Sequence, residues 1–260
     1  MAPPTGQRRR HAGAALRRPR GAALRLLKWL GTILLGWIVL SVVAVALLRW
    51  LHPLSSAMMA EARVQAWLAQ RHDYHTEYQW VSLEQISPHA AIAVVASEDQ
   101  LFPFHDGFDF NSIRAAVRAS EHGKHLRGAS TISQQVAKNL FLWSGHSFVR
   151  KGVEAYFTVL IEALWPKERI LEVYLNIAQF GDGVYGVQAA GQRFWHVPAR
   201  AINSSQAALL AAVLPNPVQM HADRPSRYVL MRRDQILVQM RVLGGASYLR
   251  ALESERREAR

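Results

Sequence analysis

The chain has no cysteine among its 260 residues, which excludes disulfide bonds and thiolate metal sites and leaves the redox compartment open. It also lacks internal repeats, and its only biased segment is an Arg/Ala-rich tail at the N-terminus. Half of the residues are hydrophobic, which is typical of a folded protein rather than a disordered one. At this length we expect one sizeable core, alone or with a separate anchor.

Acidic residues are missing from the start of the chain. Residues 1–28 carry eight Lys or Arg and no Asp or Glu, whereas 22 basic and 19 acidic residues lie from Trp50 onward. The formal charge of +12 therefore belongs mainly to the tail. The rest of the chain lacks the basic excess that is typical of a nucleic-acid-binding domain, so we expect no nucleic acid as a partner.

A long uncharged segment follows the basic tail. Leu30–Leu48 is nineteen residues without a charge, long enough as a helix to cross the roughly 30 Å core of a bilayer, and Trp29 and Trp50 flank it. The Lys and Arg before it predict a cytoplasmic N-terminus and residues 51–260 on the other side. A cleaved signal peptide is the alternative interpretation, because "AVA" at 44–46 resembles a cleavage site.

Helical periodicity dominates the sequence after this segment and predicts a mostly α fold. Ser87 is the expected cap of one helix, with Pro88 at its first position, and Ser130 is the expected cap of another. Alternation typical of a strand is brief, around 75–83, and predicts one hairpin at most. Helices are expected within 55–71, 87–100, 111–120, 130–142, 149–165, 166–180, 186–195, 203–213 and 226–244.

The first candidate site is "EDQLFPFHDGFDF" at 98–110, which follows an apolar run. Glu98 lies in the last turn of a helix rich in Ala, Ile and Val. Burial and the negative end of the helix dipole would both raise the pKa of its carboxyl, as suits a general base. A plain salt bridge of Glu98 and Asp99 with a nearby Arg, at a solvated helix end, is the other interpretation.

The same stretch holds three residue types that bind metals, His105, Asp106 and Asp109. We favour a structural interpretation, in which Gly107 takes a positive φ in a turn and Asp109 or Asn111 caps the next helix.

The second candidate site is "RGASTISQQVAKN" at 127–139. Ser130, Gln134 and Lys138 are four residues apart and share one helix face. A polar row that ends in a cation, beside the free N–H groups of a helix start, suits a phosphate-bearing ligand, although an ordinary amphipathic helix is also compatible. The residues expected to face the core are Ile132, Val136 and Leu140.

The third candidate site is "RKGVE" at 150–154, where Arg150 and Glu154 are i, i+4 partners and Lys151 lies alongside. Alone, such a pair is a routine helix ion pair.

Five motifs in order resemble the bacterial peptidoglycan glycosyltransferases (glycosyltransferase family 51), over about residues 80–217. The first three are carried by Glu98, Phe102, His105 and Gly107, then by Gly128 to Asn139, then by Arg150, Lys151 and Glu154. The fourth is "KERILEVYLN" at 167–176 with the "GDGVYGVQAA" that follows, and the fifth is "QAALLAAVLPNP" at 206–217.

The resemblance implies a lysozyme-like, two-lobed helical domain preceded by a single N-terminal transmembrane helix. The lack of a transpeptidase domain is similar to the monofunctional members, which are typical of Gram-negative inner membranes with the catalytic domain in the periplasm. The smaller lobe, called the jaw, would lie near the membrane. Four of its apolar residues are expected either in lipid or in the core: Phe141, Leu142, Trp143 and Phe148. The implied parts are a basic cytoplasmic tail (1–28), a transmembrane helix (29–50), a juxtamembrane segment (51–80), the glycosyltransferase domain (81–245) and a C-terminal tail (246–260).

The resemblance also implies lipid II and nascent glycan strands as substrates, membrane lipid as surroundings, and cell-division or cell-wall synthesis proteins as candidate partners. Glu98 would be the general base. Glu154 would orient cations or hold a divalent cation such as Mg²⁺ or Mn²⁺, and both options stay open. A lysozyme-like lytic enzyme and a non-enzymatic scaffold are the alternatives. The implied substrate-binding residues are Arg114, Ser130, Gln134, Gln135, Lys138, Asn139, Arg150 and Lys151.

Three residues depart from the family pattern. Ser133 replaces the more usual Thr, and Gln206 stands where many relatives have Glu, so we assign it no catalytic role. His146 stands where several relatives have Arg, which leaves one cationic contact to the diphosphate open.

Overall fold

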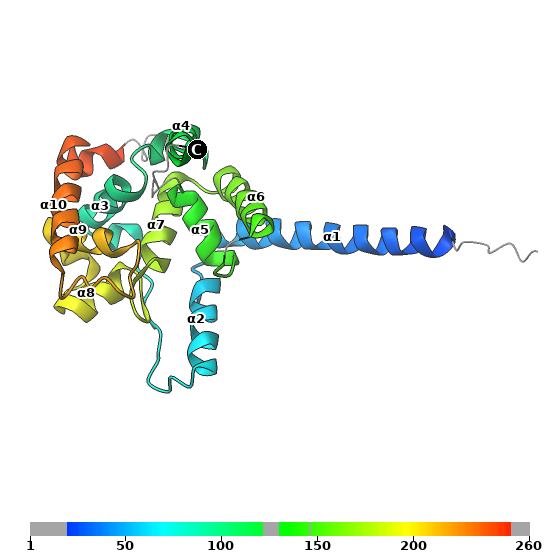
Figure 1. The fold of residues 1–260 in the computed structure, drawn as a ribbon, viewed down its shortest axis with the longest axis horizontal. Coiled ribbons are helices and arrows are strands. Elements are labelled where there is room, and N and C mark those ends of the chain that lie inside the picture. The colour runs from blue at the N-terminus through cyan, green and yellow to red at the C-terminus, as the bar shows by residue number, and fades with distance from the viewer. Residues whose placement is uncertain (1–19, 122–129, 146, 251–260) are drawn as a thin grey trace, which may run out of the picture. The chain divides into compact units, whose positions relative to one another are not determined.

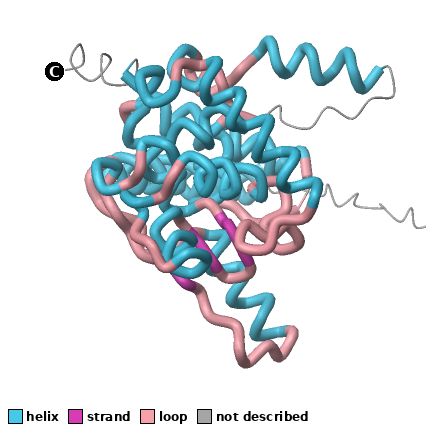
Figure 2. Tube along the Cα trace, turned by 90° about the vertical axis from the view of Figure 1, so that its left-hand side faces the viewer, coloured by secondary structure: helices cyan, strands magenta, loops and turns pink. Residues whose placement is uncertain are grey.

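The computed structural model describes residues 20–121, 130–145 and 147–250, and these fall into two units, residues 1–44 and residues 45–260. Helices make up most of the described residues, as predicted, with a small sheet in the second unit (Figures 1 and 2). The predictions for the first part of the basic tail, the loop at 122–128, His146 and residues 251–260 lie outside the described residues.

The first unit is most of α1 (Arg20–Leu48). Within it Leu24–Leu48 is long and apolar enough to cross a membrane, and the large side chains of its first part, such as Leu27 and Ile33, are exposed. The helix begins earlier than predicted because the Ala and Leu residues between Arg20 and Trp29 are good helix formers.

The second unit begins with the end of α1 and the predicted juxtamembrane helix, α2 (Ala57–Leu68). Ser56 caps α2, since its Oγ accepts a hydrogen bond from the Met59 N–H. Its centre is α3 (Pro88–Glu98), whose residues from Ala90 to Ala96 are all buried. A helix that is apolar all round must be covered on every side. Helices α9 (Ser204–Val213) and α10 (Arg227–Val242) therefore pack against α3 (Figure 1).

The predicted start of α3 is confirmed, because Ser87 Oγ accepts from the His89 N–H and Pro88 is the first helical residue. The short helix η4 (Gly245–Leu249) also packs on α3, and the Tyr248 hydroxyl donates to the Gln100 carbonyl at 2.6 Å. The packed part of the domain therefore continues beyond the expected boundary at 245.

A second group of helices consists of α5 (Ile132–Phe141), α6 (Phe148–Leu164) and α7 (Lys167–Ile177), with α5 packed on both others. Ile132, Val136 and Leu140 are buried in the core, as predicted. The prediction that Ser130 caps α5 is wrong. Thr131 is the cap, because its Oγ1 accepts from the Gln134 N–H while Gln134 Oε1 accepts from the Thr131 N–H, a reciprocal capping box.

The sheet has the order β1-β3-β2, from β1 (Glu77–Tyr78), β2 (Gln179–Gly181) and β3 (Val184–Tyr185). One hairpin is present in the described part of the chain, formed by β2 and β3, and the predicted strand region at 75–83 contains β1, which pairs parallel to β3. The β2–β3 hairpin forms because Gly183 takes a φ of +76° in the turn, and the Glu77 N–H donates to the Gly183 carbonyl. The remaining elements are α4 (Phe110–Glu121), α8 (Val187–Trp195), η1 (Leu83–Gln85), η2 (Phe102–Phe104) and η3 (Ala199–Ala201).

Candidate active site

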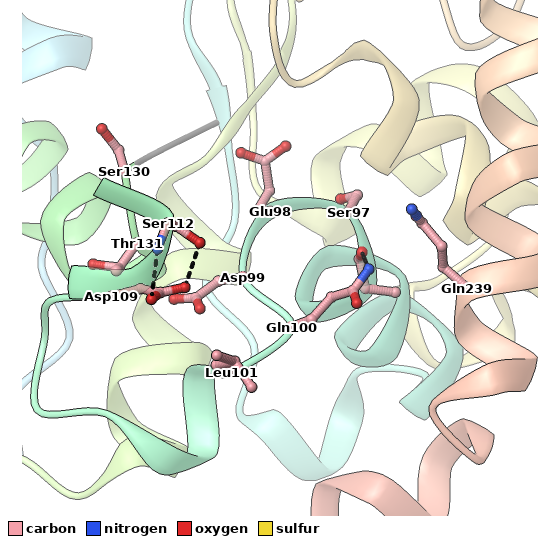
Figure 3. Close-up of a pocket in the computed structure, with 11 residues that line it drawn as sticks. Ser97, Glu98, Asp99, Gln100, Leu101, Asp109, Ser112, Ser130, Thr131 and Gln239 are labelled. Carbon is pink, nitrogen blue, oxygen red and sulfur yellow. Dashed lines mark hydrogen bonds between the residues drawn. The ribbon is translucent and has the colours of Figure 1, made fainter. Parts of the chain in front are cut away.

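Glu98 ends the apolar helix α3 at the edge of a cavity, and its side chain points away from that of Asp99 (Figure 3). Its Oε2 accepts a hydrogen bond of 2.9 Å from Gln135 Nε2 on α5. Burial raises the pKa of the Glu98 carboxyl, as predicted, and the hydrogen bond from Gln135 and the charges of Arg232 and Lys138 oppose this rise. Glu98 makes no ion pair with any described residue, so the salt-bridge interpretation is not supported.

Asp99 turns inward and joins the first and second motifs. Its Oδ2 accepts from the Ile132 N–H at 3.0 Å, at the start of α5, and both of its oxygens lie 2.9 Å from His105 Nε2. The Gly107 N–H donates to His105 Nδ1, which places the imidazole proton on Nε2, facing the carboxylate. Asp99 thus fixes the end of α3 against the start of α5, and Glu98 with it.

The structural interpretation of 105–111 is confirmed. Gly107 has a φ of +86°, and Asp109 caps α4, because its Oδ1 accepts from the N–H groups of Asn111 and Ser112 at 3.0 Å each. Hydrogen bonding to Ser112 lowers the pKa of Asp109.

Gly107 should not tolerate a side chain. A Cβ there would lie 2.8 Å from Thr158 Cγ2 and 2.9 Å from Glu162 Cγ, in a backbone conformation that favours glycine. We expect Gly107→Ala to lower the free energy of unfolding by about 1–3 kcal/mol, measured by urea denaturation. Gly152→Ala is the matched control, because its Cβ meets nothing within 4 Å on an exposed part of α6. The control should gain about 0.5–1 kcal/mol; equal effects of the two changes would contradict the steric argument.

Glu98 lines one of two neighbouring cavities, and its partner Gln135 lines the other. The Glu98 cavity has a volume of about 330 Å³ and is lined by uncharged polar residues such as Ser97, Gln100 and Gln239 and by the carboxylates Glu98, Asp99 and Asp109 (Figure 3). The cationic cavity has about 490 Å³ and is lined by residues of the second and third motifs, among them Gln134 and Gln135. Ser130 lines both cavities. Because Thr131 caps α5, the Ser130 side chain is not needed as a cap and can line the two cavities.

The cationic cavity contains a buried carboxylate surrounded by cations. Arg150 Nη1 lies 2.9 Å from Glu154 Oε2, and Lys151 Nζ pairs with Glu154 Oε1. Lys138 faces the same cavity and forms no ion pair with a described residue. Burial is the main cause that lowers the pKa of Lys138. Three cations around one carboxylate leave an excess of positive charge, and the buried Arg150 Nε has no hydrogen-bond partner among the described residues, so this cavity suits an anionic ligand.

Glu154 does not offer a ready metal site. Both of its oxygens are engaged by Arg150 and Lys151, and the described lining of the cationic cavity holds no other carboxylate and no imidazole. A hard divalent cation prefers several oxygen ligands. The described lining of this cavity therefore does not fit a metal ion at Glu154, whose carboxylate pairs with Arg150 and Lys151 instead.

The structure does not bring every predicted residue to the cavities. Arg114 is exposed on α4, and neither it nor Asn139 lines either cavity. Two residues near Glu98 were not predicted from the sequence: Arg232, whose charge acts on Glu98 from α10, and Tyr174, whose hydroxyl donates to Gln135. A tyrosine on the apolar face of a helix indicates a hydrogen-bond partner but not which one. Nothing in the sequence distinguishes Arg232 from its basic neighbours.

The fourth motif is largely structural. Arg169 donates to the carbonyl of Leu48, the last residue of α1, and to that of Leu51, and Glu172 accepts from the Leu83 N–H. Asn176 exchanges two hydrogen bonds of 2.9 Å with the backbone of Val81. This face of α7 thus holds the end of α1 and the segment at 81–83 by hydrogen bonds.

The aromatic residues of the expected jaw divide between the core and the surface. Phe141 stacks on Phe157 and Leu142 is buried, so both belong to the core. Trp143 is 54% exposed and Phe148 is 99% exposed, as a lipid-contacting role requires.

Two of the departures from the motifs have structural explanations. Ser133 Oγ donates to Glu162, which keeps the hydroxyl function of the usual Thr. Gln206 forms a capping box with Asn203 at the start of α9, a role that Gln and Glu fill alike.

Comparison with known proteins agrees with this geometry. The sequence model of the family described as "Transglycosylase" matches residues 65–241. The chain therefore belongs to the transglycosylase family, as the five motifs predicted.

Its relatives include proteins named "Biosynthetic peptidoglycan transglycosylase". That of Pseudomonas syringae pv. syringae (strain B728a) is 52% identical over 217 residues, which cover 84% of this chain and 92% of the relative. That of Xylella fastidiosa (strain M23) is 51% identical over 211 residues, which cover 81% of this chain and 87% of the relative. That of Pseudomonas putida (strain KT2440) is 49% identical over 232 residues, which cover 89% of this chain and 98% of the relative.

Proposed function

We propose that this transglycosylase is a peptidoglycan glycosyltransferase that polymerises glycan chains, with lipid II as its substrate. The observation that carries the proposal is the position of Glu98, a carboxylate with a raised pKa that lines a polar cavity without cations among its described residues and is hydrogen-bonded to Gln135 of the neighbouring cationic cavity. Reaction between a sugar hydroxyl and a sugar diphosphate needs both environments side by side. The relatives' names describe the same biosynthetic role.

In this proposal Glu98 is the general base. Its Oε2 is held by Gln135, and its Oε1 accepts the proton of the 4-hydroxyl of the incoming lipid II. The hydroxyl oxygen forms a bond to the anomeric carbon of the growing chain as the bond from that carbon to the diphosphate breaks. Attack from the opposite face converts the α linkage to β-1,4. The polar lining of the Glu98 cavity suits the acceptor sugar.

The leaving group is a polyprenyl diphosphate, which departs as an anion and needs no protonation. Lys138, Arg150 and Lys151 would balance its charge, and Glu154 keeps two of these cations in place. A hydrolase that cleaves glycan strands would need an acid for its sugar leaving group and has no use for this cation cluster. The cluster therefore favours the polymerase over a lytic enzyme.

We propose that α1 remains as a single-pass anchor in a bacterial inner membrane, with the N-terminus in the cytoplasm and the catalytic domain in the periplasm. Its apolar stretch of 25 residues and the basic residues before it support this topology. Because the substrates carry lipids that stay in the bilayer, an anchor confines enzyme and substrate to the same surface and raises their effective concentration. Exposed Trp143 and Phe148 would contact membrane lipid.

Incubation of the full chain in detergent with fluorescently labelled lipid II tests the proposed function. We expect a ladder of glycan polymers on a gel, and an identical ladder when a chelator is present, because the described lining of the cationic cavity has no carboxylate or imidazole that is not already paired with a cation. A parallel incubation with purified sacculi should release no fragments. If the protein releases fragments from sacculi and forms no polymer from lipid II, the proposed polymerase function is wrong and a lytic function takes its place.

A further inference from the structure

A buried hydroxyl lies directly behind the residue that holds Glu98. Tyr174 is completely buried on α7, and its hydroxyl donates to Gln135 Oε1 at 3.0 Å. Gln135 Nε2 in turn donates to Glu98 Oε2 at 2.9 Å. These two bonds form a continuous chain from the core to the proposed base, across three helices.

The order of donors in this chain matters for the charge on Glu98. When the Tyr174 hydroxyl donates to the amide oxygen, the amide N–H₂ group must face the carboxylate. Hydrogen bonds in series also polarise one another, so the phenol makes the amide a stronger donor. Both effects favour the ionised form of Glu98, which is the form that accepts a proton.

The other groups that face Glu98 act independently of Tyr174. Burial and the charge of Asp99 disfavour the ionised carboxylate, whereas Arg232 on α10 and Lys138 on α5 favour it. The hydrogen bond from Gln135 is the largest of the influences that lower the pKa of Glu98. A residue that controls the orientation of Gln135 therefore also affects the pKa of Glu98.

We propose that Tyr174 is a positioning residue for glycosyl transfer, which holds the Gln135 amide with its N–H₂ toward Glu98 and so sets the pH at which Glu98 can act as a base. Without the hydroxyl, the amide oxygen is buried without its donor, and the amide can turn to present its carbonyl to a protonated Glu98. The inference rests on the proposed function for its kinetic consequence, but not for its effect on the titration of Glu98.

The test is Tyr174→Phe in the full chain, with polymerisation of lipid II followed across pH. We expect the midpoint of the acid limb of kcat/KM to move up by about one pH unit, while the rate at high pH stays close to that of the wild type. A purely structural role would lower the rate at all pH values and the melting temperature, and would leave the midpoint in place. Tyr78→Phe is the control, because it removes a hydrogen bond of 2.6 Å from a phenol to the Pro53 carbonyl, away from the cavities. Its midpoint should not move.

A second readout does not need turnover. Infrared titration of the Glu98 carboxyl, taken as the difference between each protein and its Glu98→Gln counterpart, should show the same upward shift in Tyr174→Phe. On a Gln135→Ala background, Tyr174→Phe should cause no further shift, because the group that transmits it is gone. An unmoved midpoint in both readouts overturns the inference. A shifted carboxyl in a protein that does not polymerise lipid II would instead remove the proposed function and keep the hydrogen-bonded chain.

Discussion

Glu98→Gln is expected to abolish polymerisation of lipid II, with a loss in kcat of about 10²–10⁴-fold, the usual contribution of a general base. The amide is nearly the same size as the carboxylate but cannot take the proton of the acceptor hydroxyl. The Gln135 side chain can still hydrogen-bond to the amide oxygen, so the site should keep its geometry. The measurement is the initial rate of polymer formation by the purified full chain. Activity within tenfold of the wild type would remove Glu98 as the base.

The stability of the same variant separates loss of chemistry from loss of fold. Because the folded-state pKa of Glu98 lies above its unfolded value, the ionised side chain lowers stability at neutral pH, and this cost grows as pH rises through the ordinary glutamate range toward the raised value. Glu98→Gln removes that cost. Thermal unfolding at neutral pH should therefore show a melting temperature at or above that of the wild type.

The pH profile of the wild-type rate should fall on the acid side at a pH above the ordinary glutamate pKa.

Lys138→Ala is expected to reduce kcat by about 10²–10³-fold, since it removes a preorganised cation from the cavity proposed for the diphosphate. Burial lowers the pKa of this lysine, and no described carboxylate forms an ion pair with it. In the free enzyme its charge is therefore costly, and its removal should not lower the melting temperature. A rate that falls while stability holds or rises would show a residue kept for its ligand rather than for the fold.

Two further variants sharpen this result. Lys138→Arg keeps the charge in a different shape and should recover part of the lost rate. Arg71→Ala removes a cation that pairs with Asp182 on the surface and should leave the rate unchanged. If Arg71→Ala slows the reaction as much as Lys138→Ala, the effect comes from overall charge and not from the cavity.

The sequence predicted the parts of this protein that local patterns determine. The cap of α3 at Ser87, the buried face of α5 and the raised pKa of Glu98 follow from residue types within a single helix. The family and its first three motifs were recognisable because their residues are close together along the chain.

Longer-range relations were not predictable in the same way. The start of α5 at Thr131 depends on a reciprocal bond with Gln134, and two adjacent residues, Ser130 and Thr131, are both good caps by type. The bond between Tyr174 and Gln135 joins residues 39 apart in the chain, and the parallel pairing of β1 with β3 joins residues still further apart. Such contacts arise from tertiary packing, which periodicity in one sequence does not encode.

The hydrogen bonds that Trp165 and Arg169 make with the end of α1 have a consequence for insertions into the chain that follows it. Trp165 Nε1 donates to the Val45 carbonyl at 2.7 Å, and Arg169 binds the carbonyls of Leu48 and Leu51. Flexible residues inserted after Leu51 would lengthen only the loop before α2, because the chain up to Leu51 is already hydrogen-bonded to Trp165 and Arg169. Such an insertion would therefore not lengthen the connection between α1 and the rest of the second unit.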